Sequence, residues 1–336
     1  MQQISFATAE HQTKKRVTRR EKFLAEMDQV VPWQRLVAAI EPHYPTGKRG
    51  RPPIGLERML RLYFVQQWYG LADEALEDAV SDSAAIRNFV GIDLGREEAP
   101  DATTVLKFRR LLEANELTER LFAQINAHPS ERGLMMREGT MVDATIINAP
   151  SSTKNKAKER DGEMHQTKKR NQRHIRHEGA HRGRRRFRPG AQRACHSGQR
   201  IGRGPHARAA ARTRARRIRR CAGYAGVQKR DESIEAQQAG RILPDVKWSV
   251  TTGRAKLKAM AEGPLKDLTQ ALERVKAQIR ARVEHPFHVV KNLFKHKKAR
   301  YKGLAKNGAQ MFSLFGLANL VIAKKQWMAL QARGAS

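Results

Sequence analysis

Two carboxylates far apart in the sequence are the residues best suited to chemistry. Asp143 interrupts the apolar, β-rich stretch 139–150, whose composition is typical of a buried central strand. A buried carboxylate is costly without a cation, a donor or a metal ion beside it. Glu284 lies between Arg280 and Lys291, and the three recur at helical spacing. An Asp on a strand and a Glu on a distant helix could converge on a divalent metal. The alternative is a structural carboxylate at a strand end, and the residues alone leave both open.

The charge of the chain predicts a polyanionic partner. Its 336 residues hold 66 Lys and Arg against 33 Asp and Glu, a formal net charge of +33. Such an excess favours DNA or RNA as the partner. No run of 18 apolar residues predicts a membrane span, and the N-terminus lacks a signal-peptide pattern. Cys195 and Cys221 make neither a disulfide framework nor a zinc site, so we expect a cytoplasmic, nucleoid-associated protein.

The first 130 residues predict a basic arm followed by a helical domain. Residues 1–20 are polar and basic, and we expect a flexible arm there. Residues 21–130 show apolar residues at helical period, with a helix opening at 100–104 and another from Leu117 to His128. Several short helices ending in one with basic residues suit a helix-turn-helix DNA reader. An ordinary helical bundle with a solvated basic face remains the alternative.

Two sets of cations in this half are candidate DNA contacts. The helix after residue 100 carries Lys107, Arg109 and Arg110. The segment 47–53 carries Arg49 and Arg51 in a Gly-Arg-Pro context similar to an AT-hook, whose arginines enter the narrow minor groove. The alternative for this segment is a proline-terminated linker whose charges face solvent.

The stretch 172–221, here called the arginine block, differs from the sequence around it. It holds 17 Arg and no Lys, and it has no Leu, Val, Met, Trp or Tyr. One interpretation is a selected nucleic-acid arm, disordered until it binds. The other is coding sequence translated out of frame, which we favour because a selected arm rarely avoids lysine. Either way, we expect no buried strands in the block and a disordered segment in the free protein.

After the arginine block the sequence predicts ordinary structure again. Val246, Trp248 and Val250 alternate like a strand. Residues 265–279 carry leucines and other aliphatic residues at the spacing of a long amphipathic helix, which Pro286 is expected to kink or restart. Residues 304–330 predict a last apolar helix. The chain is therefore predicted to be α+β, with helices first and a mixed domain at 137–330.

Several motifs together resemble bacterial insertion-sequence transposases of the DDE type, in the IS-four/IS-five group. The stretch around Asp143 resembles the first catalytic strand of that family, and the segments 151–156 and 164–169 resemble the loop after it. The segments 51–53 and 100–104 resemble the amino-terminal domain of the family. The group's signature is Tyr, two residues, Arg, three residues, Glu, six residues, Lys. Arg280, Glu284 and Lys291 fit this spacing, while Ala277 stands where the Tyr is expected.

The resemblance implies an RNase H-like catalytic domain, a mixed sheet with flanking helices whose three carboxylates hold two Mg²⁺ or Mn²⁺ ions. Asp143 and Glu284 would be two of the metal ligands, and Arg280 and Lys291 would contact DNA phosphates. The implied partners are the terminal inverted repeats and target DNA, bound by a homodimer on paired ends.

One departure bears on activity. The family's second catalytic Asp precedes Ala-Gly-Tyr, and here Cys221 precedes Ala222, Gly223 and Tyr224. A thiol is a poor magnesium ligand. The inner strands expected between the first two acids fall inside the arginine block, so we expect them to be disrupted and this copy to be inactive. The alternatives are a non-catalytic DNA-binding protein derived from a transposase and a nucleic-acid-coating protein dominated by the block.

Overall fold

The structure is a computed structural model that divides into two compact units. It describes residues 16–47, 53–132, 134, 140–142, 147, 164–169, 172–177, 217–220, 247–250, 252 and 254–334. One unit contains the described residues up to Leu134, with Leu293–Lys295 and the chain from Phe312 onward, and the other contains the rest. We call them the helical unit and the sheet unit. Among the described residues, no helix combines the length and hydropathy needed to cross a bilayer.

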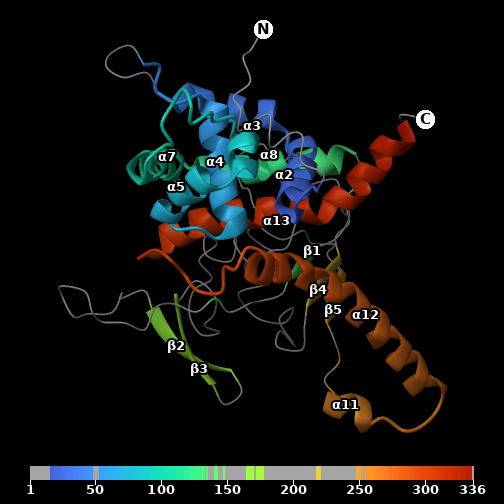
Figure 1. Ribbon diagram of the computed structural model, residues 1–336. Helices are drawn as coiled ribbons and strands as arrows, with labels where there is room; N and C mark the ends of the chain where they lie inside the picture. The colour runs from blue at the N-terminus through green and yellow to red at the C-terminus, as the bar shows by residue number, and fades with distance from the viewer. Residues whose placement is uncertain are drawn as a thin grey trace. The chain divides into compact units, whose positions relative to one another are not determined.

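The helical unit confirms the helix series expected for residues 21–130 (Figure 1). Its apolar side chains alternate with polar ones at helical period, and Leu36, Leu60 and Phe122 are among those buried completely. The helices are α2 (Arg19–Val30), α3 (Trp33–Ile40), α4 (Leu56–Tyr69), α5 (Asp73–Asp82), α6 (Ala84–Val90), α7 (Ala102–Ala114) and α8 (Leu117–Glu131), with a 3₁₀ turn, η1, at Glu41–His43.

Side-chain caps fix where two of these helices begin. Thr18 and Glu21 form a reciprocal capping box at the start of α2, so Arg19 and Arg20 are helical rather than part of the expected arm. Asp101 caps α7 by accepting the backbone N–H of Thr104 at 2.7 Å, as the 100–104 sequence predicts. Residues 1–15 lie outside the described part of the chain.

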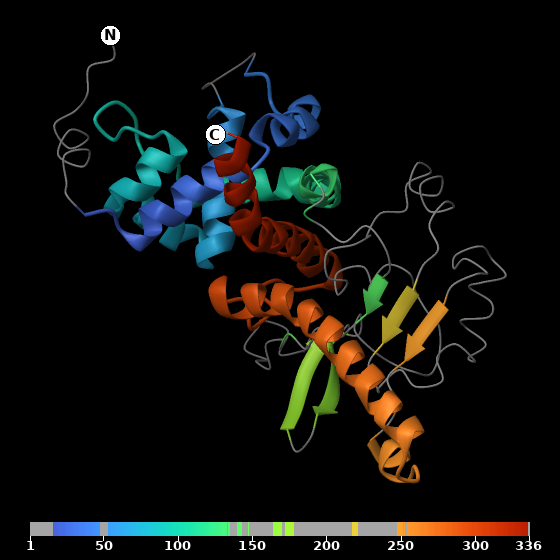
Figure 2. The ribbon, with the colours of Figure 1, turned by 90° about the vertical axis from the view of Figure 1, so that its right-hand side faces the viewer.

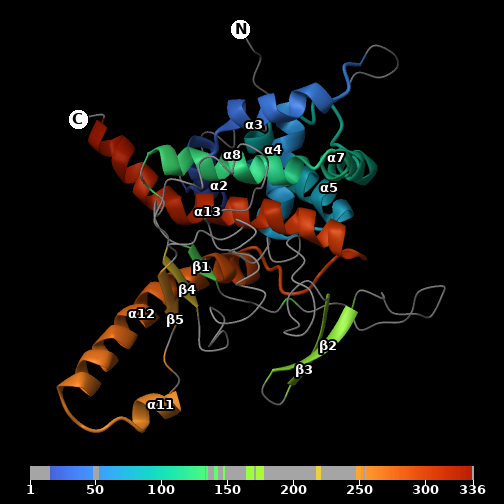
Figure 3. The ribbon, with the colours of Figure 1, turned by 180° about the vertical axis from the view of Figure 1, so that it is seen from behind.

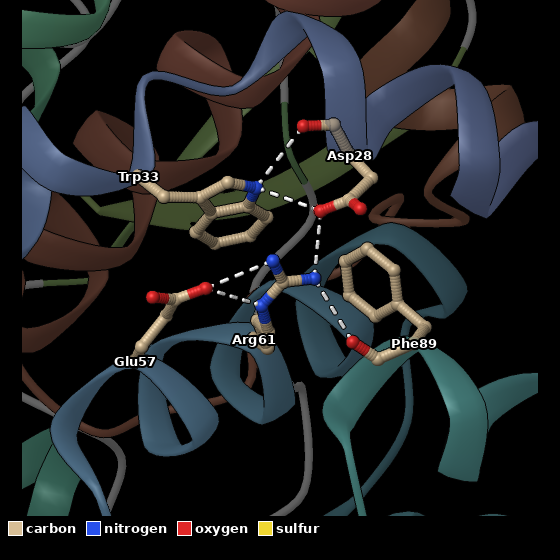
Figure 4. A network of polar contacts seen from close by, with 5 residues as sticks. All are labelled: Asp28, Trp33, Glu57, Arg61 and Phe89. Carbon is tan, nitrogen blue, oxygen red and sulfur yellow. Dashed lines mark hydrogen bonds and ion pairs between the residues drawn. The ribbon is translucent and has the colours of Figure 1, made fainter.

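Arg61 joins four helices of the helical unit (Figure 4). Its guanidinium pairs with Asp28 of α2 at 2.7 Å and with Glu57 of α4 at 2.8 Å, and it donates to the carbonyl of Phe89 in α6 at 2.9 Å. Its Cζ lies 4.3 Å from the ring centroid of Trp33 in α3. The indole of Trp33 in turn donates to the carboxylate of Asp28 at 2.9 Å. The guanidinium of Arg61 therefore holds these helices together.

The last helix, α13 (Leu304–Gly334), completes the core of the helical unit with its part from Phe312 onward (Figure 3). Gly316 lets it approach α8 closely, because a Cβ there would lie 3.3 Å from Ile125 and 3.4 Å from Phe122. Asn319 donates to Asn126 across the same contact at 2.8 Å. The sequence expectation of an apolar helix at 304–330 is confirmed, and the core it completes joins segments about 200 residues apart.

The sheet unit holds two sets of strands (Figure 2). Strands β1 (Thr140–Val142), β4 (Arg217–Arg220) and β5 (Lys247–Val250) form a parallel sheet in the order β1-β4-β5. Strands β2 (Met164–Lys169) and β3 (Gln172–His177) pair antiparallel. β5 confirms the strand expected around Trp248.

Strands β3 and β4 lie within the arginine block, so the expectation that the whole block is disordered is wrong at 172–177 and 217–220. The burial of these strands lies outside what the structure describes, so the expectation of no buried strands stays a prediction. Ladder hydrogen bonds come from the backbone, which every residue type here except proline supplies in full. Ile175 and Ile218 also place a β-branched residue in each strand. The rest of the block lies outside the described residues.

Helix α12 (Pro264–His288) continues through Pro286 instead of restarting there, and it widens into a π-helix, η6 (Val289–Leu293). A short helix, α11 (Arg254–Lys258), precedes it. The predicted apolar stripe is present, but Leu265 and Leu268 are 71% and 70% exposed, and Leu272 and Val275 are 54% and 50% exposed. Polar side chains such as Glu273, which accepts from Thr252 at 3.1 Å, are the half-buried ones.

Candidate functional site

Asp143 comes directly after strand β1, and Cys221 comes directly after strand β4. The two strands are parallel neighbours, and Val142 pairs with Arg220 as the last pair of their ladder. Asp143 and Cys221 themselves lie outside the described residues. In the sequence, each of them directly follows one member of that last pair. Carboxyl ends of parallel strands are where α/β sheets commonly place their ligand sites.

The second expected acid, Glu284, is exposed near the end of α12. Arg280 precedes it by four residues on the same helix, which is about one turn. The side chain of Arg280 lies outside the described part of the chain. Lys291 lies in η6 and is half-buried. The structure thus has Arg280 and Glu284 on one helix, with Lys291 on the π-helix that continues it.

The donor set does not fit a pair of magnesium ions. Within the described part of the chain, no three His, Cys, Asp or Glu side chains gather closely enough to hold a metal. The sequence offers Asp143 and Glu284 as hard oxygen ligands, but where the resemblance to the family places the second acid it offers the thiol of Cys221. Mg²⁺ requires oxygen ligands, and thiolates select softer ions.

The three cations expected on α7 have different roles. Lys107 and Arg110 are exposed and suited to contact a phosphate. Arg109 is 8% exposed, and its two terminal nitrogens donate to the two carboxylate oxygens of Asp73 at 2.7 and 2.9 Å. The same carboxylate accepts from Gln66 at 2.6 Å. Arg109 therefore joins α7 to α5, and it is not available to DNA in this arrangement.

The helical unit is not the source of the chain's positive charge. Residues 53–132 hold 14 Asp and Glu against 9 Lys and Arg. Several of those arginines are already paired, as Arg58 is with Glu97 at 2.9 Å and Arg61 is with Asp28. Arg49 and Arg51 lie outside the described residues. Among the DNA-contact candidates on α7, Lys107 and Arg110 are therefore the two whose side chains are exposed.

The chain beyond Glu284 is a basic segment that was not predicted from the sequence. Residues 285–336 contain no Asp or Glu, yet they contain ten Lys and Arg. The exposed members cluster between η6 and α13, where Lys297, Lys298, Arg300 and Lys302 alternate with buried His296 and Ala299. The sequence does show this segment, as a long stretch without Asp or Glu. The larger positive charge of the arginine block made it less apparent.

Two protein families match the chain. Residues 11–111 match a transposase domain, DUF772, and residues 202–320 match a transposase DDE domain. The second match begins inside the arginine block and includes Cys221, Arg280, Glu284 and Lys291, while Asp143 lies before it. No solved structure matches the chain. The chain therefore carries two transposase domains in the order that the sequence motifs predict.

Proposed function

We propose that this chain, with its amino-terminal transposase domain and its DDE domain, derives from an insertion-sequence transposase that binds the element's ends but no longer cleaves DNA. The order of the two family matches supports the lineage. An RNase H-like catalytic fold fits the mixed set of strands, with a parallel sheet and an antiparallel pair.

The proposed loss of activity rests on the two residues that follow the last pair of the β1–β4 ladder in the sequence. Val142 and Arg220 are paired, and the residues that follow them are Asp143 and Cys221. By the resemblance to the family, the second acid is expected at the residue that follows β4 in the sequence, and that residue is the thiol-bearing Cys221. In the family, bound metal ions activate the attacking water or 3′-OH and stabilise the leaving oxygen. Two carboxylates and a thiol do not supply the oxygen ligands for that pair.

DNA binding does not require the metal site. We propose that Arg49, Arg51, Lys107, Arg110, Arg280 and Lys291 contact phosphates of the terminal repeats and that the chain acts as a dimer on paired ends. Such contacts make log affinity fall with log salt concentration. The full chain should bind duplex DNA without metal, and binding that does not weaken as salt rises would contradict this part of the proposal.

Strand cleavage is tested on a plasmid that carries the element with its flanking DNA, in Mg²⁺ or Mn²⁺. We expect no cleavage and no strand transfer by the chain as given. Cys221→Asp alone should not restore activity, because most of the segment between the first two acids still belongs to the arginine block. Cleavage by the unaltered chain that disappears with Asp143→Asn would overturn the proposed loss of activity.

The arginine block provides a second test. We propose that a reading-frame change produced it, and resequencing the gene should then show compensating insertions or deletions that bracket codons 172–221. Restoring the frame should restore cleavage, and Asp143→Asn or Glu284→Gln should then abolish it. An intact frame in independent copies of the element would favour a selected nucleic-acid arm.

A further inference from the structure

The segment His296–Gly303, here called the basic loop, has a defined backbone. The backbone N–H of His296 donates to the carbonyl of Val290 in η6 at 3.0 Å. At the other end the side-chain amide of Asn307 donates to the carbonyls of Tyr301 and Gly303, both at 2.7 Å. Gly303 has φ +89°, a conformation that favours glycine. These bonds fix where the loop begins and where it ends.

Burial alternates along the basic loop and selects which side chains face solvent. His296 is 2% exposed and Ala299 is 8% exposed, whereas Lys297, Lys298, Arg300 and Lys302 are all exposed. Burial and the neighbouring Arg300 lower the pKa of His296 to about 4, so its ring is neutral at pH 7. Four of the six residues 297–302 are therefore exposed cations, and the buried residues next to them, His296 and Ala299, are uncharged.

The charges of the basic loop have no carboxylate neighbours along the chain, since the last acid of the sequence is Glu284. Within the described residues, no ion pair involves Lys297, Lys298 or Lys302. Concentrating like charges is unfavourable unless a polyanion neutralises them. The loop thus differs from the helical unit, where several arginines are paired with acids.

We infer that the basic loop is a binding surface for the phosphate backbone of duplex DNA. Six residues span roughly 20 Å at most, enough for several successive phosphates of one strand. Single-stranded nucleic acid usually requires exposed aromatic rings for base stacking. The only aromatic residue besides His296 in the loop is Tyr301, which is half-buried, so duplex DNA is the better fit. This inference rests on the proposed function and assigns part of its DNA contact to residues outside the signature.

The test compares two triple variants of the full chain that remove equal charge. The loop variant carries Lys297→Gln, Lys298→Gln and Lys302→Gln. The control carries Lys258→Gln, Arg274→Gln and Lys325→Gln, which are exposed residues of α11, α12 and α13. Arg300 is left intact because it lies beside buried His296. Fluorescence anisotropy of a labelled 30-base-pair duplex, titrated with KCl, gives the slope of log affinity against log salt for each protein.

Each phosphate contact contributes about 0.9 to that slope, so the loop variant should lose about 2 to 3 in slope, and the control should lose less than about 1. Equal slopes for the two variants, with wild-type binding intact, would overturn the role of the loop and leave the proposed function standing. Wild-type binding that is absent or insensitive to salt would overturn both. A loop variant that loses affinity for single strands but not for duplex would refute the duplex assignment. Circular dichroism melting of both variants establishes that the fold is retained.

Discussion

Replacing Arg109 tests whether the cation next to the exposed face of α7 is structural. The substitution Arg109→Met removes the guanidinium that donates to Asp73 at 2.7 and 2.9 Å while keeping an unbranched stem of similar length. Removing one partner of a fully buried ion pair typically costs about 3 to 5 kcal/mol. The side chain of Asp73 is 26% exposed and that of Arg109 is 10% exposed, so some solvent reaches the remaining carboxylate.

Two further features of the site reduce the cost of leaving Asp73 unpaired. Its carboxylate still accepts from Gln66 at 2.6 Å, and it lies in the first turn of α5, where a negative charge is favourable. We therefore expect Arg109→Met to lower the free energy of unfolding by about 2 to 3 kcal/mol. Adding Asp73→Leu should recover part of that loss, because the uncompensated charge is then removed as well.

The assay is urea unfolding followed by tryptophan fluorescence, since Trp68 and Trp327 are buried in the helical unit. Native-state hydrogen exchange of the α5 and α7 amides localises the effect. Arg110→Met is the matched control, an exposed neighbour whose loss should change stability by less than about 0.5 kcal/mol. DNA affinity should show the reverse order, with Arg110→Met the weaker binder. Equal small stability losses for both variants, or a larger DNA defect for Arg109→Met, would refute the structural role.

Three further predictions concern single positions. Hydrogen bonds from Thr104 and Thr103 lower the pKa of Asp101 to about 2, so the stabilising effect of its carboxylate is complete above about pH 4 and is lost as pH falls through 2. The difference in urea midpoint between wild type and Asp101→Asn should therefore shrink over that range. A difference that does not depend on pH would contradict this prediction. Leu317→Ala, at a fully buried position, should lower the free energy of unfolding in urea by about 2 to 5 kcal/mol. Leu268→Ala, at a position 70% exposed, should lower it by less than about 0.5 kcal/mol. Comparable losses for the two variants would mean that the apolar side chains of α12 are covered in solution. Gly316→Val should lower the melting temperature by overpacking the α8–α13 contact at a cost of about 1 to 3 kcal/mol, and an unchanged melting temperature would argue against that close approach.

The periodic features of this protein were predictable from local sequence. Apolar spacing predicted the helices of the first 130 residues and the helix at 304–330, and alternation around Trp248 predicted β5. These features depend on interactions between residues a few positions apart, so a single sequence carries them. The same holds for the lineage, because the spacing of Arg280, Glu284 and Lys291 is itself a local pattern and lies within the matched DDE domain.

Composition alone did not predict the strands of the arginine block. Its lack of large apolar residues indicated a disordered segment, yet β3 and β4 form there because backbone ladders do not depend on apolar side chains. The register that matches Val142 with Arg220, and so relates the positions after β1 and β4, is set by pairing between segments about 80 residues apart. No local pattern encodes such a pairing.

Tertiary structure decided which cations are exposed and which are buried in ion pairs. In the sequence, Lys107, Arg109 and Arg110 are three adjacent bases of one helix. Folding places Asp73 of α5 against only one of them, so Arg109 becomes a buried partner while its neighbours stay exposed. In the same way, burial of His296 and Ala299 turns the lysines of the basic loop outward. The sequence by itself determined how much charge the chain carries and in which segments. Only the packing of distant elements determined which charges are neutralised internally and which face solvent, because pairing and desolvation depend on neighbours in space.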